Sequence, residues 1–226
     1  MSILSNSHRT ATIAYIAPFL VYVSLMELGR ATAFPAGVTL PIRFLFVLLV
    51  LLVTSRTLVF RRPSFPVASL AVGIGVFLIW IAPDLQFHYR DHWLFQNRIF
   101  GSAVSSIAPE LQRSGGFLAI RILSSTALVP VVEELFWRGW LMRWLIDPSF
   151  QKVPLGKYTP LAFWGVALLF ASEHGPYWDV GLAAGIVYNW WLVRCRNLAD
   201  CILAHAATNA ALAVFVLLSG QWQYWL

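Results

Sequence analysis

The chain has 226 residues, of which 59% are hydrophobic and 12% are charged. Soluble domains average about 45–50% apolar and about 25% charged residues, so this composition excludes an ordinary soluble domain and indicates a polytopic membrane protein. A formal net charge of +6 would point to nucleic acid in a soluble protein, but in membrane proteins basic residues collect in cytoplasmic loops. We therefore expect the basic residues to set topology, and we expect no nucleic-acid partner.

Seven apolar segments follow one another along the chain and predict an all-α bundle of transmembrane helices. They cover residues 11–28, 41–59, 67–82, 117–146, 160–174, 180–193 and 198–218. At about 1.5 Å per residue, the fifth and sixth segments are too short to cross a hydrocarbon core of about 30 Å. We expect one or both of them to be short or re-entrant, in a bundle of about seven to eight segments.

A polar stretch separates the third apolar segment from the fourth. We interpret it as an interfacial connector whose aromatic residues lie at the level of the lipid headgroups, namely Trp93, Phe95 and Phe100. The chain is then a single integral membrane domain, residues 1–226, in three parts: N-terminal spans over 1–82, the connector over 83–116 and a functional region over 117–218.

The two cysteines, Cys195 and Cys201, flank a predicted turn and lack CxxC spacing. They indicate neither a disulfide framework nor a thiolate metal site, so we expect reduced thiols.

Two adjacent acids interrupt the fourth apolar segment, in the run Pro130-Val-Val-Glu133-Glu134-Leu-Phe-Trp-Arg138. Ionisable groups at membrane depth are candidates for functional sites. Glu134 and Arg138 are i,i+4 neighbours on one helical face and can pair. Glu133 projects about a quarter-turn away and stays uncommitted. The alternative interpretation is one buried structural network of all three charges.

Polar residues also interrupt two later apolar segments. His174 follows Phe170 by four residues, and Asn209 follows His205 by four, so each pair shares a helical face. Taken singly, such a histidine is more often a hydrogen-bonded packing residue, and Asn209 could join two helices. Together, an acid, two imidazoles and an amide are the groups that activate water and stabilise an oxyanion.

The order of these motifs resembles the signature of the CAAX protease and bacteriocin-processing family, intramembrane endopeptidases related to the type II CAAX prenyl protease. The matching motifs are Glu133-Glu134-x-x-x-Arg138, Phe170-x-x-x-His174 and His205-x-x-x-Asn209. The resemblance covers roughly residues 117–218. It implies a helical membrane bundle, usually of eight segments, around an intramembrane catalytic cavity.

By position, the resemblance also implies a role for each motif residue. It assigns water activation to Glu133 with His174 as its partner, and oxyanion stabilisation to His205 and Asn209. Support of the site falls to three further residues: Glu134, Arg138 and Phe170. The implied enzyme is a glutamate-type peptide hydrolase that needs no cofactor.

The nearest alternative is a zinc metalloprotease with Glu133, His174 and His205 as ligands, a set of the right kind for catalytic zinc. The sequence contains no HExxH motif. The run from His88 to His92 has the histidine spacing, but Tyr89 occupies the position of the general base, so we interpret it as a coincidence.

A second alternative is a non-proteolytic membrane scaffold, regulator or transporter subunit, in which the buried polar residues join helices or carry protons. Asn209 separates these readings, because a proton path does not need an amide four residues from a histidine, whereas an oxyanion hole does.

The resemblance implies a membrane-associated or lipidated protein or peptide as substrate, and a lipid bilayer as surroundings. Candidates are a prenylated C-terminal CAAX peptide, a bacteriocin leader, a membrane-anchored peptide or a sorting-signal protein. The compact chain is similar to bacterial CAAX-protease-related proteins of exosortase systems. We therefore expect a monomeric, multi-pass protein of the bacterial inner membrane.

Overall fold

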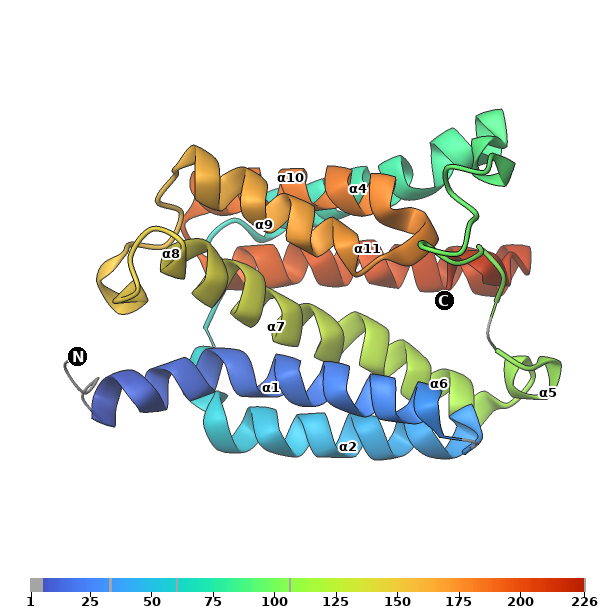
Figure 1. Cartoon of the computed structure of the whole chain (residues 1–226), viewed down its shortest axis with the longest axis horizontal. Coiled ribbons are helices and arrows are strands. Elements are labelled where there is room, and N and C mark those ends of the chain that lie inside the picture. Colours follow the sequence, from blue (N-terminus) through green and yellow to red (C-terminus); the bar gives the residue numbers. More distant parts are fainter. Residues whose placement is uncertain (1–5, 33, 60, 106, 226) are drawn as a thin grey trace.

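The computed structural model describes residues 6–32, 34–59, 61–105 and 107–225, and it is built from helices (Figure 1). Five helical stretches are long and apolar enough to cross a membrane: Arg9–Ala31, Ala36–Thr54, Pro66–Phe87, Gly115–Trp144 and Leu198–Ser219. Within the described ranges, extended pairing is limited to one isolated bridge between Asn97 and Gly101. The predicted all-α bundle is confirmed.

Helices occupy all seven predicted segments. The N-terminal half contains α1 (Asn6–Ala31), α2 (Ala36–Thr54), the single turn α3 (Arg56–Val59) and α4 (Pro66–Phe87). The C-terminal half contains α9 (Pro160–Ser172), α10 (Trp178–Cys195) and α11 (Leu198–Ser219). Helix α5 (Pro109–Gln112) and four 3₁₀ turns lie in the connections: η1 (Tyr89–Asp91), η4 (Phe150–Lys152), η5 (Gly175–Tyr177) and η6 (Trp222–Tyr224).

Prolines mark two differences from the predicted helix ends. Helix α2 begins at Ala36, before Pro41, and α4 continues beyond Pro83 to Phe87. Each proline removes one hydrogen bond of its helix, to the carbonyl of Gly37 for Pro41 and of Ile79 for Pro83, and the helix continues past both prolines.

The apolar run around the two acids predicted one regular α-helix, but the structure has several consecutive α-helical and π-helical segments there. It passes through α6 (Gly115–Leu123), the π-helical η2 (Ser124–Leu128), α7 (Val129–Glu134), the π-helical η3 (Leu135–Leu141) and α8 (Met142–Trp144). Pro130 explains the first π segment, because proline lacks an N–H and its ring crowds the carbonyl four residues earlier. The turn widens, and the Val129 N–H donates to the Ser124 carbonyl, five residues back.

The helices form two groups on either side of this long segment (Figure 1). Helices α1 and α2 pack together on one side, while α4, α9, α10 and α11 lie on the other. A Cβ at Gly73 of α4 would collide with the carbonyl oxygen of Ala204, so this glycine permits the close approach of α4 and α11. The buried Asp200 of α11 fixes the start of α4, because its carboxylate accepts from the Ser64 and Phe65 N–H groups, each at 2.8 Å.

The three aromatic residues of the connector differ in their surroundings. Trp93 is 70% exposed, as a headgroup-level residue would be. Phe95 and Phe100 instead stack on Trp178, with ring centroids 5.9 and 5.8 Å from it. The N-terminus of α10 therefore provides an aromatic partner for these two residues, and the position of all three rings at the level of the lipid headgroups stays a prediction.

Candidate active site

Glu134 and Arg138 form the predicted buried ion pair. The Arg138 Nη1 donates to Glu134 Oε1 at 3.1 Å, and both side chains are 0% exposed. Arg138 also donates from Nε to Asn189 Oδ1 at 2.9 Å and from Nη2 to the Gly185 carbonyl at 3.3 Å. Its guanidinium lies 4.4 Å from the centre of the Phe170 ring. The buried positive charge is therefore compensated by one carboxylate, two further acceptors and an aromatic face.

His205 is held in a defined orientation by Glu134 and Tyr188. Its Nδ1 lies 3.0 Å from Glu134 Oε1, and its ring stacks on Tyr188 at 5.0 Å with an interplanar angle of 23°. Tyr188 is itself anchored, because its hydroxyl donates to Thr208 Oγ1 at 2.7 Å. Since an ionised carboxylate only accepts, Nδ1 carries the hydrogen of this bond. The other ring nitrogen, Nε2, is directed towards Glu133, at 4.0 Å from Oε2.

Glu133 has no such set of partners. Its side chain is 13% exposed, and its Oε2 is buried with no hydrogen-bond partner among the described residues. Buried polar atoms are nearly always satisfied, and exceptions are frequent where a group has a chemical role. At 4.0 Å, the approach to His205 is longer than a hydrogen bond. The predicted pairing of Glu134 with Arg138 is thus observed, through Glu134 Oε1, while Glu134 Oε2 is buried without a hydrogen-bond partner among the described residues, like Glu133 Oε2.

His174 lies just beyond the end of α9. Its Nδ1 is 2.7 Å from the Phe170 carbonyl oxygen, and its ring contacts Phe170 and Trp80, at centroid distances of 4.7 and 5.4 Å. A Cβ at Gly181 would lie 3.0 Å from the His174 ring, so this glycine leaves room for the imidazole. Among the described residues, no hydrogen bond or ion pair joins His174 to Glu133.

Asn209 faces the π-helical turn produced by Pro130. Its Nδ2 donates to the Ser125 carbonyl oxygen at 2.8 Å. In a π-helical ladder this carbonyl would receive the N–H five residues later, but that residue is Pro130, which has none. The amide of Asn209 therefore satisfies a carbonyl that the proline leaves without its ladder partner.

Two side chains of α10 belong to the site and were not predicted. Asn189 connects Arg138 to α9, because its Nδ2 donates to the Phe163 carbonyl at 2.7 Å. Tyr188 supports the His205 ring. An asparagine inside an apolar helix is a sequence signal for such a role, although periodicity alone does not identify its partner.

The predicted zinc alternative needs three ligands around one point. In the described part of the chain, no group of three or more His, Cys, Asp and Glu side chains is placed to hold a metal ion. His88 and His92 do not share a helical face, because His88 ends α4 in the left-handed conformation, with φ of 49°. Cys195 and Cys201 are buried free thiols.

Two cavities accompany the bundle without including the candidate active site. One, of about 600 Å³, lies at the end of the bundle and is lined by Asp84, Arg90 and Tyr177 among others. The second, of about 500 Å³, is an apolar groove between α4 and α11. Neither is lined by Glu133, His174 or His205. The intramembrane catalytic cavity that the resemblance implies stays a prediction.

Comparisons with known proteins identify the segment that carries these residues. Residues 115–211 match the family model described as type II CAAX prenyl endopeptidase Rce1-like. No curated protein and no solved structure matches the chain. The matched segment contains all three motifs, and together with the five spanning helices it makes the chain a multi-pass membrane protein. Residues 115–211, which carry the candidate site, are thus similar to the Rce1-like type II CAAX prenyl endopeptidases of the CAAX protease family.

Proposed function

We propose that the chain is a glutamate-type intramembrane endopeptidase, in which Glu133 activates the water that hydrolyses a peptide bond. The observation that carries this proposal is the contrast between two adjacent acids. Through its Oε1, Glu134 accepts from Arg138 and His205, and its Oε2 has no hydrogen-bond partner among the described residues. Glu133 takes part in neither of these bonds; its Oε2 is buried, has no hydrogen-bond partner in the described part of the chain, and lies 4.0 Å from His205 Nε2. A carboxylate with a free acceptor atom is the group that a general base requires.

In the proposed reaction, the water oxygen attacks the scissile carbonyl carbon while Glu133 takes its proton. The carbonyl oxygen becomes an oxyanion, which His205 Nε2–H and the second N–H of Asn209 stabilise. Because Nδ1 carries the hydrogen of its bond to Glu134, donation from Nε2 requires His205 to carry both ring hydrogens. Glu133 then returns the proton to the departing amine, and His174 assists this transfer. Glu134, Arg138 and Phe170 hold the catalytic groups in place.

The proposed substrate is a membrane-associated or lipidated protein or peptide. Glu133 lies inside a spanning helix, so a scissile bond must reach it from within the membrane region. The family description names a prenyl endopeptidase, which makes a prenylated peptide ending in a CAAX sequence the first substrate to test.

The test is hydrolysis by purified protein in liposomes, carried out in water enriched in ¹⁸O. We expect a prenylated CAAX peptide, or a membrane-anchored peptide from a panel, to be cleaved with one ¹⁸O atom in the new carboxyl group. Absence of cleavage across the panel, and of new protein termini in cell membranes that contain the protein, would refute the proposal.

A further inference from the structure

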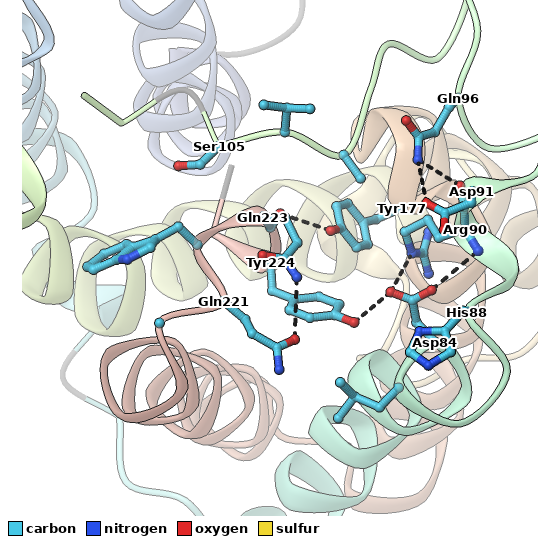
Figure 2. Close-up of a pocket in the computed structure, with 15 residues that line it drawn as sticks. Asp84, His88, Arg90, Asp91, Gln96, Ser105, Tyr177, Gln221, Gln223 and Tyr224 are labelled. Atoms are coloured by element: carbon cyan, nitrogen blue, oxygen red, sulfur yellow. Dashed lines mark hydrogen bonds and ion pairs between the residues drawn. The ribbon is translucent and has the colours of Figure 1, made fainter. Parts of the chain in front are cut away.

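Arg90 is a buried arginine in the polar connector, where basic residues were expected only to mark topology. Its side chain is 3% exposed and donates from Nη1 to the Pro176 carbonyl at 2.6 Å. The same nitrogen lies 3.1 Å from Asp179 Oδ1. Nε lies 3.7 Å from Asp84 Oδ2, and Figure 2 shows this second ion pair. One guanidinium therefore joins the end of α4, the turn η5 and the start of α10.

The turn that Arg90 holds is the one that follows His174. The Tyr177 N–H donates to the His174 carbonyl at 2.9 Å, and the Arg90 guanidinium lies 4.2 Å from the centre of the Tyr177 ring. Trp80 contacts both rings, at 5.4 Å for His174 and 5.9 Å for Tyr177. Because α9 ends at Ser172, regular helix does not fix the His174 backbone. Its position depends on η5 and on the groups that hold η5.

Two phenols complete the cluster around Arg90. Tyr89 donates to Asp179 Oδ2 and Tyr224 donates to Asp84 Oδ2, each at 2.5 Å (Figure 2 shows the second). Burial, with these hydrogen bonds, raises the pKa of both phenols, so they remain neutral donors. Both carboxylates are thus held on two sides, and the guanidinium between them is fixed in direction. Such a cluster specifies geometry more than it adds stability.

We propose that Arg90 is a positioning residue, which holds η5 so that the His174 imidazole keeps its place against Phe170. This inference rests on the proposed role of His174 and adds a residue outside the family match, since residues 115–211 do not include Arg90. Its guanidinium donates from Nη1 to the Pro176 carbonyl and Asp179 and from Nη2 to the Tyr89 hydroxyl, and Nε lies in ion-pair range of Asp84 without a hydrogen bond. A lysine ammonium cannot reproduce this fork of donors.

The first test does not require activity. Hydrogen–deuterium exchange is compared for the wild type, Arg90→Lys and Arg90→Ala, with Arg98→Ala as the matched control. Arg98 is an exposed arginine of the same connector. We expect faster exchange confined to residues 171–180 in both Arg90 variants and no change in the control. Unchanged exchange at 171–180, or an equal rise throughout the bundle, would overturn the inference.

The second test uses hydrolysis. We expect Arg90→Ala to lower kcat by about 10²-fold, with KM nearly unchanged, and added guanidinium to restore part of the rate. In a His174→Ala background, the same substitution should have no further effect on kcat. A full additional loss in that background would show that Arg90 does not act through His174. If the wild type cleaves nothing, the proposed function fails, while the exchange experiment still decides the role of Arg90.

Discussion

His205 Nδ1 lies 3.0 Å from Glu134 Oε1, the same oxygen that accepts from Arg138 Nη1 at 3.1 Å. One carboxylate oxygen thus serves a guanidinium and an imidazole, and it fixes which ring nitrogen of His205 is directed towards Glu133. The second acid of the pair acts on the chemistry only through this orientation. Glu134 thus orients His205, whereas Glu133 is the proposed base, and mutation can separate these two roles.

Substitution of Glu134 should lower stability, because Glu134 pairs with the buried Arg138. We expect Glu134→Ala to lower the free energy of unfolding by about 3–5 kcal/mol, because it leaves Arg138 as a buried charge without its carboxylate. Glu134→Gln keeps an acceptor oxygen and should cost less. The double variant with Arg138→Ala should be more stable than the sum of the single changes predicts. Thermal unfolding in detergent is measured for the wild type and all four variants, and strictly additive losses would contradict the pairing.

Asn209 should affect both stability and rate. Asn209→Ala leaves the Ser125 carbonyl unsatisfied, at a cost of about 1–3 kcal/mol. If its second N–H stabilises the oxyanion, kcat should also fall by about 10²–10³-fold. Unfolding and kcat, measured on the same preparation, separate the two effects. A loss of stability with unchanged kcat per folded molecule would assign Asn209 to the support of η2 alone.

Gly181 tests whether the position of His174 matters. A methyl group there would lie 3.0–3.1 Å from three His174 side-chain atoms, so we expect Gly181→Ala to displace the ring and lower kcat by up to about 10²-fold. Gly75→Ala is the matched control, because a Cβ at Gly75 meets no atom within 4 Å. Equal kcat values for the two variants would show that the position of the His174 ring does not matter for the reaction.

The positions of the helices and the pairing of Glu134 with Arg138 could be predicted from the sequence. Both depend on local properties, namely the length of apolar runs and the four-residue spacing of one helix. The other partners of Arg138 could not be predicted in the same way. Asn189 and Gly185 lie 51 and 47 positions further along the chain, and only the packing of α10 brings them to the guanidinium.

Pro130 and Arg90 show two further limits of the sequence pattern. The apolar run around Pro130 continues without a break, so periodicity predicts one helix and does not reveal the widened turn that Asn209 serves. Arg90 is one of several arginines in or near a polar stretch, and nothing local distinguishes it from the exposed Arg98. Its burial results from the meeting of α4, η5 and α10.

Metal content tests the choice between a glutamate base and a zinc centre. We expect hydrolysis to persist in a strong chelator, and the purified protein to contain well below one metal ion per chain by elemental analysis. The reason is that no three His, Cys, Asp or Glu side chains of the described residues lie close enough together to hold a metal ion. Stoichiometric zinc that tracks activity, and is lost in a His174→Ala variant, would support the metalloprotease instead.

The rate of ¹⁸O incorporation by Glu133→Gln in liposomes tests most directly whether Glu133 is the base that activates water. The amide keeps the shape of the side chain but cannot take a proton from water, so we expect the rate to fall by at least about 10²-fold at an unchanged unfolding temperature. Glu110→Gln, which changes an exposed acid of the connector, should hydrolyse at the wild-type rate. Wild-type hydrolysis by folded Glu133→Gln protein would contradict the assignment of Glu133 as the base.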